Sequence, residues 1–174
     1  MRVFVLICSA LMLLVSNQAF SQALEYANQD YRFSINFPAP PTQHPVTYTI
    51  SDGRDVPATL FYTETRRGRF SVIALRLPDD AAHRSAEIES IADRMRARPG
   101  NLLYQELNEK DGFPIQLLTL EAPDGRRSMI GILVHERRLF ITEGNVASGA
   151  PPPLQFQQTL FLLDENGEKF GIDE

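Results

Sequence analysis

Hydrophobic and polar residues alternate along most of this chain, which is the pattern of β-strands with one buried face. The clearest case is 31–37, where aromatic residues and isoleucine occupy every second position. We expect this strand to end at Pro38 and the proline-rich segment 38–45 to be an extended loop, because proline donates no hydrogen bond to a sheet. The same reasoning predicts further strands at 46–50, 58–65, 70–77, 102–107, 115–121, 128–135 and 139–143, and a last short one at 161–163.

The predicted strand 70–77 is apolar on both faces, so we expect it in the middle of a sheet that is covered on both sides. The strands after residue 100 are separated by short turns at regular intervals, which indicates an antiparallel meander rather than βαβ units.

One long helix is predicted from residue 81 or 85 to residue 98. Ile88, Ile91, Ala92 and Met95 recur with helical spacing and form one apolar stripe, and Pro99 follows directly after the segment. Glu87 and Glu89 near its start and Arg94, Arg96 and Arg98 near its end match the helix dipole.

A second, shorter helix is expected after Pro151–Pro153, carrying Phe156 and Leu160 on one face. The predicted fold class is therefore α+β. We expect a central antiparallel sheet of six to eight strands, flanked by a long crossover helix and a shorter C-terminal helix as an αβα sandwich. A single domain spans 24–163, and 164–174 is expected to be a polar, frayed tail.

The first 23 residues resemble a cleavable secretory signal. Arg2 is followed by an apolar run over 3–15, which is too short to span a membrane, and small residues stand near Ala23. We expect cleavage after Ala23, with Ala19 as the alternative, and location in the periplasm or outside the cell. Cys8 is the only cysteine, so the mature chain would have no disulfide and no thiol site.

The whole chain has a net charge of −5, which argues against nucleic acid and anionic membranes as partners. No second long apolar run follows the signal, so the mature chain is not expected to cross a membrane. Fifteen of the 17 basic residues are arginine, which indicates either anion recognition or the base composition of the genome.

Three arginine pairs fall at predicted turns. The pairs are Arg66–Arg67, Arg126–Arg127 and Arg137–Arg138. Strand length places the last two roughly 25 Å apart, at opposite ends of the sheet, so at most two of the three pairs can share an end. We expect all of them to be solvated, with weak and salt-sensitive anion affinity.

No constellation of catalytic or metal-binding residues stands out. The three histidines are scattered, and His135–Glu136 begins a zinc-helix motif that fails at Leu139. Ser148 lacks a nucleophile-elbow sequence, and the segment 164–167 places its glycine too early for an EF-hand. We therefore predict no catalytic, cofactor-binding or metal site and no cofactor, and we do not expect an enzyme. The remaining residues considered and set aside are His44 and His83, and the carboxylate pairs Asp79–Asp80 and Asp164–Glu165.

The order of elements resembles exported bacterial proteins of the PsbP-like fold, which is named for an extrinsic protein of photosystem II and shared with a Ran-release factor. The resemblance rests on the opening strand 31–38 with Pro40–Pro41 behind it, the hairpin 60–77, the helix around 88–95, the meander, and the closing Phe156–Leu160. It implies a central antiparallel sheet flanked by helices and implies no catalytic set.

Together these features predict an exported, soluble, non-enzymatic binding or assembly module that acts through protein–protein contacts in the cell envelope. One alternative is a periplasmic binder of a small ligand held between sheet and helix, which requires a cavity of a few hundred Å³. The other is a hydrolase with an unrecognised site, which requires a nucleophile within hydrogen-bond reach of a base.

Overall fold

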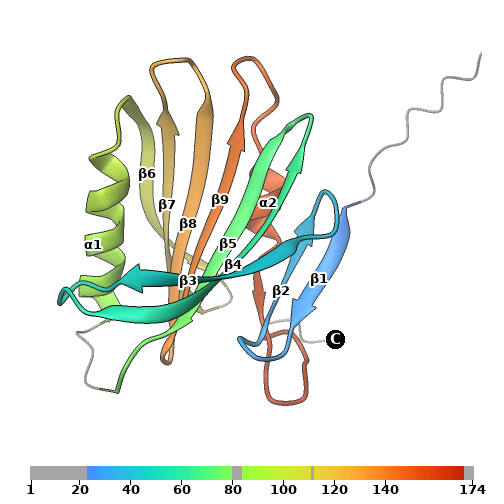
Figure 1. The fold of residues 1–174 in the computed structure, drawn as a ribbon, viewed down its shortest axis with the longest axis vertical. Helices are drawn as coiled ribbons and strands as arrows, with labels where there is room; N and C mark the ends of the chain where they lie inside the picture. The colour runs from blue at the N-terminus through green and yellow to red at the C-terminus, as the bar shows by residue number, and fades with distance from the viewer. Residues whose placement is uncertain (1–22, 80–83, 111, 171–174) are drawn as a thin grey trace, which may run out of the picture.

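A seven-stranded antiparallel sheet forms the centre of the protein (Figure 1). The computed structural model describes residues 23–79, 84–110 and 112–170, so the predicted signal peptide lies outside the described residues except for Ala23. The strand order is β3-β4-β5-β9-β8-β7-β6, so β3 and β6 are the two edges. Its strands are β3 (Thr42–Thr49), β4 (Asp55–Thr65), β5 (Gly68–Arg76), β6 (Asn101–Lys110), β7 (Phe113–Glu121), β8 (Arg127–His135) and β9 (Arg138–Val146).

The helix α1 (Arg84–Arg96) covers one face of this sheet, packing on β8 and β7. Ile88, Ile91 and Met95 are buried against sheet residues such as Ile132, which confirms the predicted apolar stripe. Glu87 was expected to interact with the helix dipole at the start of α1, and the structure shows that it also binds a neighbouring turn. It is fully buried, and its carboxylate accepts hydrogen bonds from the backbone N–H and, at 2.5 Å, the hydroxyl of Ser51.

The other face is covered by a small sheet and a short helix. The small sheet has the order β1-β2-β10, formed by β1 (Leu24–Asn28), β2 (Phe33–Phe37) and β10 (Phe161–Leu162), and the helix is α2 (Leu154–Gln158). Phe33 packs between Phe61 and Phe140, with ring centroids 5.3 and 5.5 Å away. The predicted α+β sandwich is confirmed, but this outer layer is more sheet than helix. The central strand β5 lies between two apolar layers, as its two apolar faces predict.

The N-terminal third differs from the prediction in three places. Strand β1 was not expected, and β2 begins at Phe33 because Arg32 has a φ of +54° within the preceding turn. The second half of the segment expected as a proline loop is strand, since β3 already begins at Thr42 and Pro45 lies opposite Thr59. An edge strand tolerates proline, because one of its sides needs no hydrogen-bond donor.

The described part of the predicted tail is an ordered turn rather than a frayed end. Asp164 accepts hydrogen bonds from the backbone N–H groups of Asn166 and Glu168, both at 2.8 Å, and Leu163 forms a β-bridge with Lys169. In the described residues no helix is long and apolar enough to cross a membrane.

Candidate functional site

The edge strand β6 carries four of the six large apolar side chains that are exposed in the described part of the chain. Nothing in the described part of the chain pairs with this edge. Nine of its ten residues are exposed. Soluble proteins normally protect an edge strand with proline, lysine or a short length, because its unpaired backbone groups can recruit another strand. The exposed apolar residues of β6 are Leu102, Leu103, Tyr104 and Leu107, which are 45, 49, 47 and 66% exposed.

The two edges of the sheet are protected to different degrees. Edge strand β3 contains Pro45, whereas β6 has no proline, and its one lysine is its last residue, Lys110. A register irregularity between Leu102 and Tyr104 disturbs the start of β6. The following residues, 104–110, pair regularly with β7. The edge therefore offers a regular stretch of seven residues.

A groove lies beside this edge on the face that carries α2. Its volume is about 560 Å³. The apolar side chains of Leu117, Met129 and Leu154 contribute to its walls, together with the ring of Tyr104 from β6. The Tyr104 hydroxyl donates a hydrogen bond to Glu106, and this hydrogen bond raises the pKa of the phenol. An apolar groove with a few polar groups has the character of a binding site.

Gln157 is the polar residue of this groove that stands out. It is only 8% exposed, and its side-chain nitrogen finds no hydrogen-bond partner among the described residues. Leaving a buried donor unpaired costs about 1–3 kcal/mol, so native proteins rarely retain one. Gln157 lies over Gly131 of β8, where a Cβ added to the glycine would lie 3.4 Å from the Gln157 Cγ. The same Cβ would lie 2.8 Å from the Thr142 hydroxyl oxygen, so the glycine makes room for Thr142, with Gln157 packed above it.

A second hollow lies beside the same edge on the opposite face, under the start of α1. It has a volume of about 600 Å³, and its lining includes Ile88, Leu107 and Pro114. Strand β6 thus has one hollow on each side of it. The residues that sequence reasoning missed, Tyr104, Leu107 and Gln157, all belong to these two hollows.

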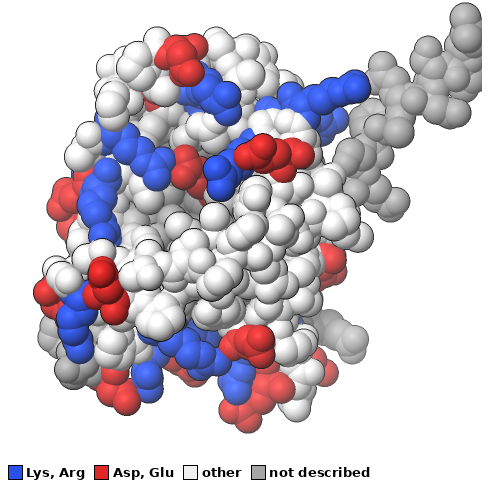
Figure 2. Space-filling view, in the orientation of Figure 1, with Lys and Arg blue, Asp and Glu red and all other residues white. Residues whose placement is uncertain are grey.

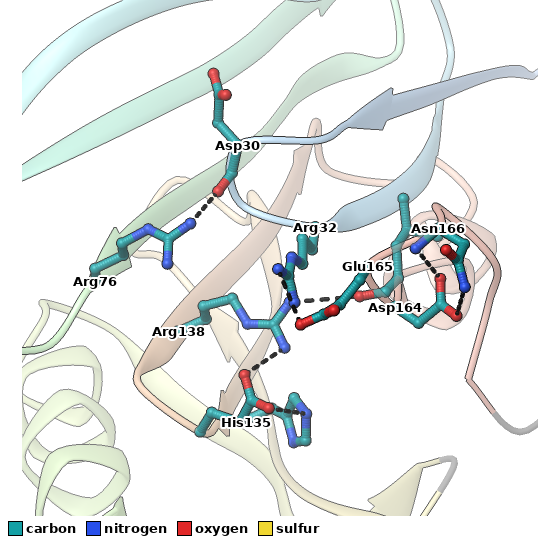
Figure 3. A network of polar contacts seen from close by, with 10 residues as sticks. Asp30, Arg32, Arg76, His135, Arg138, Asp164, Glu165 and Asn166 are labelled. Atoms are coloured by element: carbon teal, nitrogen blue, oxygen red, sulfur yellow. Dashed lines mark hydrogen bonds and ion pairs between the residues drawn. The ribbon is translucent and has the colours of Figure 1, made fainter.

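A cluster of polar residues around the buried Arg138 lies at the turn between β8 and β9 (Figure 3). Arg138 is 2% exposed and donates to the Glu136 carboxylate at 2.9 Å and to the Leu163 carbonyl at 3.4 Å. Close by, Arg32 and Glu165 form an ion pair at 3.6 Å. The expectation that all the paired arginines are solvated is therefore wrong for Arg138. It is the first residue of β9, and its side chain points under the C-terminal turn.

His135 lies in the same cluster without a polar partner at hydrogen-bond distance. Its ring stacks near Phe113, at 4.2 Å between centroids, and near Phe170, at 5.5 Å. Neither ring nitrogen donates or accepts a hydrogen bond within the described residues. Burial lowers the pKa of His135, and Arg138 lowers it further. The imidazole lies between two aromatic rings and packs the C-terminal turn onto the sheet.

The remaining residues considered from the sequence do not converge. His44 is exposed on β3, 5.4 Å from the ring of Tyr62, while His83 and Asp80 lie outside the described residues. Ser148 is exposed after β9, and in the described residues it has no hydrogen bond to a histidine. The Asp164 carboxylate accepts backbone hydrogen bonds within its own turn, first from Glu168 and then from Asn166, and these lower its pKa. Within the described ranges no three His, Cys, Asp or Glu side chains cluster as metal ligands.

The arginine pairs lie where strand geometry predicts. Arg66–Arg67 in the β4–β5 hairpin and Arg126 before β8 line one cleft, whereas Arg137–Arg138 are at the other end of β8. Arg127 is not part of this cleft's lining and pairs with Glu121 at 3.0 Å. The predicted separation of Arg126–Arg127 from Arg137–Arg138 is confirmed.

Comparison with known proteins supports the fold and leaves the activity open. No family model and no curated protein matches the chain. Among solved structures, a Bacteroides thetaiotaomicron protein aligns with a TM-score of 0.51 and 15% identity over 83% of this chain and 50% of its own. A cyanobacterial PsbP from Synechocystis aligns with a TM-score of 0.48 and 15% identity over 75% of this chain and 84% of its own. The chain thus spans half the length of the Bacteroides protein.

A PsbP is among these structural neighbours, in agreement with the resemblance to the PsbP-like fold that the element order predicts. At 15% identity the likeness concerns the fold alone. Function has to be argued from the surface of this chain.

Proposed function

We propose that this protein is an exported binding module whose partner is another protein, and that an extended segment of that partner adds to the sheet as a strand beside β6. The single observation that supports this most strongly is the open β6 edge with its exposed apolar side chains. In strand addition, main-chain hydrogen bonds supply affinity, and pockets for alternate side chains supply specificity.

The two hollows beside β6 fit this mode of binding. Successive side chains of an added strand point to opposite faces of the sheet. Every second side chain would enter the groove beside α2, and the others would enter the hollow beside Leu107 and Ile88. A partner segment with apolar residues at both sets of positions therefore matches this edge.

Export is the second part of the proposal and rests on the sequence. The apolar run near the N-terminus and the small residues before Leu24 favour a cleaved signal. We propose that the mature protein begins at Leu24 and meets its partner in the cell envelope. The absence of cysteine after Cys8 is compatible with an oxidising compartment, because no thiol would be lost there.

Site-specific photo-cross-linking in the producing cells tests the proposal. A photoreactive phenylalanine analogue at Asn108 on β6 should cross-link to one defined protein. The same analogue at Thr47 on the opposite edge strand, also exposed, is the matched control and should not. Cross-links to that protein from Thr47 alone, or from neither position, would overturn the proposal.

A second candidate function is the binding of a small ligand in the groove beside α2. Gln157, with its unpaired buried nitrogen, favours it, because a ligand oxygen would supply the missing acceptor. A ligand of this kind would fill the groove and leave the outer edge of β6 unpaired, so the cross-linking pattern distinguishes the two functions.

A further inference from the structure

An arginine-lined cleft lies on the α1 face of the large sheet, at the end formed by the β4–β5 hairpin. Its volume is about 740 Å³, and its floor includes the partly exposed side chains of Leu60 and Ile73. Figure 2 shows Lys and Arg side chains around a hollow on this face. This cleft is formed by β4, β5, β9 and the turn before β8, whereas the binding edge proposed above is β6.

The floor of the cleft is held by a chain of hydrogen bonds. Ser128 donates to the Glu143 carboxylate at 2.7 Å and accepts from the Asn145 amide at 2.7 Å. Arg98, just after α1, donates to the same Glu143 oxygen at 2.8 Å. Arg126 donates from Nε and a terminal nitrogen to the Asn145 oxygen, at 2.9 and 2.5 Å. These contacts fix the position of two guanidinium groups.

Among the described residues, these hydrogen bonds leave the Arg126 guanidinium without a carboxylate partner. Glu143 is the carboxylate of the floor, and Arg98 already pairs with it. The partner of Arg126 is a neutral amide, so this guanidinium keeps its full charge while its orientation is fixed. A preorganised cation of this kind loses little side-chain entropy when an anion binds.

The rim adds three more arginines. Arg66 and Arg67 form no ion pair with any carboxylate in the described residues, and Arg69 lies 4.7 Å above the ring of Tyr62 and 3.9 Å from Glu64. Four arginines therefore line this cleft against two carboxylates, Glu64 and Glu143, on a chain whose net charge is −5. Charge of one sign gathered in a cleft concentrates ligands of the opposite sign.

We propose that this cleft binds a small molecule that carries at least two oxyanion groups, either phosphate or carboxylate. Planar guanidinium groups pair with both groups through two parallel hydrogen bonds. One group would be held between Arg126 and the floor, and the other by Arg66 and Arg67 on the hairpin. The volume of the cleft, about 740 Å³, exceeds what a single bound ion needs, and the apolar floor at Leu60 and Ile73 would contact the part of the molecule between its charges.

Calorimetric titration of the chain from residue 24 with pyrophosphate and with citrate tests this proposal and distinguishes phosphate from carboxylate ligands. We expect at least one of them to bind at low ionic strength, and added salt to weaken the binding. Arg126→Ala, and the double change Arg66→Ala with Arg67→Ala, should each weaken binding by about 10-fold or more, because each removes charge-assisted hydrogen bonds.

Two further variants keep the test falsifiable. Arg137→Ala, at the opposite end of β8 and exposed, should leave the affinity unchanged. Asn145→Asp should reduce binding as strongly as Arg126→Ala, because it places a carboxylate against Arg126, and circular dichroism should show the fold intact. Failure of both anions to bind, or an equal loss in Arg137→Ala and Arg126→Ala, would overturn the proposal. Neither result bears on strand addition at β6.

Discussion

The ammonium group of Lys110 donates a hydrogen bond to the backbone carbonyl of Gln158 at 2.9 Å. This contact joins the last residue of the exposed edge strand β6 to the last residue of α2. It closes one end of the groove that lies between them, since both residues belong to its lining. The groove and the edge are therefore parts of one surface, and a change in either is expected to affect the other.

The buried, unpaired amide of Gln157 should lower the stability of the free protein. Because its side-chain nitrogen is buried and unpaired, Gln157→Leu is expected to leave the free energy of unfolding unchanged or raise it by up to about 2 kcal/mol. Urea denaturation measures this. The same change at the neighbouring exposed residue, Gln158→Leu, is the matched control and should stay within about 0.5 kcal/mol. A clear loss of stability in Gln157→Leu would mean that its amide is satisfied in the free protein.

Ile88 should contribute strongly to the core under α1. Its side chain is 6% exposed, so Ile88→Ala is expected to lower the free energy of unfolding by about 2–5 kcal/mol through lost burial and the cavity that remains. Leu107→Ala, at an exposed position on β6, should change it by no more than about 0.5 kcal/mol. Similar losses in the two variants would contradict the packing described for α1.

His135 should make the protein less stable in mild acid. Burial, with Arg138 as a second cause, lowers the pKa of His135 below its ordinary value of about 6.5. The unfolded chain therefore takes up a proton that the folded chain does not, so the free energy of unfolding falls as the pH drops below about 6.5. Thermal denaturation between about pH 7.5 and 5.5 should show this slope in the wild type and a smaller slope in His135→Phe.

A second histidine substitution, His44→Phe on the exposed edge strand β3, is the matched control for the loss of a histidine side chain. If the His135→Phe and wild-type slopes are equal, the stability in this pH range depends on other groups.

The mature N-terminus is expected at Leu24. N-terminal sequencing of the protein recovered from the periplasm or the medium should begin there, or at Phe20 if cleavage follows Ala19. Protein that retains Met1 in a cytosolic fraction would contradict export.

Hydrophobic periodicity predicts the elements whose burial is repetitive. The apolar stripe of α1 and the doubly apolar strand β5 both report their surroundings directly, because each apolar position faces a core. Hydrophobic periodicity does not predict strand β1, because the strand is short and each of its five residues is either exposed or only partly buried. Pairing with β2, rather than its own side chains, keeps it extended.

The candidate site could not be predicted from sequence because it depends on where a strand lies in the sheet. The segment around Leu102 and Leu107 is apolar like its neighbours, and nothing local shows that the crossover through α1 places it at an edge. Gln157 gives no signal either, since its burial depends on how α2 packs on β8 and β9. The arginine cleft is predictable only in part. Strand length separates Arg126 from Arg138, but it does not show at which of these two ends of the sheet Arg66 lies.

Whether β6 receives an extended segment is measured most directly by backbone amide hydrogen exchange. The probe is a synthetic peptide that spans the segment of the partner cross-linked to Asn108, and exchange is followed residue by residue by NMR. We expect the amides of 104–110 that face away from β7 to slow by about tenfold or more when the peptide binds, because each gains a hydrogen-bond acceptor. Slowing confined to other segments, with unchanged exchange along this edge, would contradict strand addition at β6.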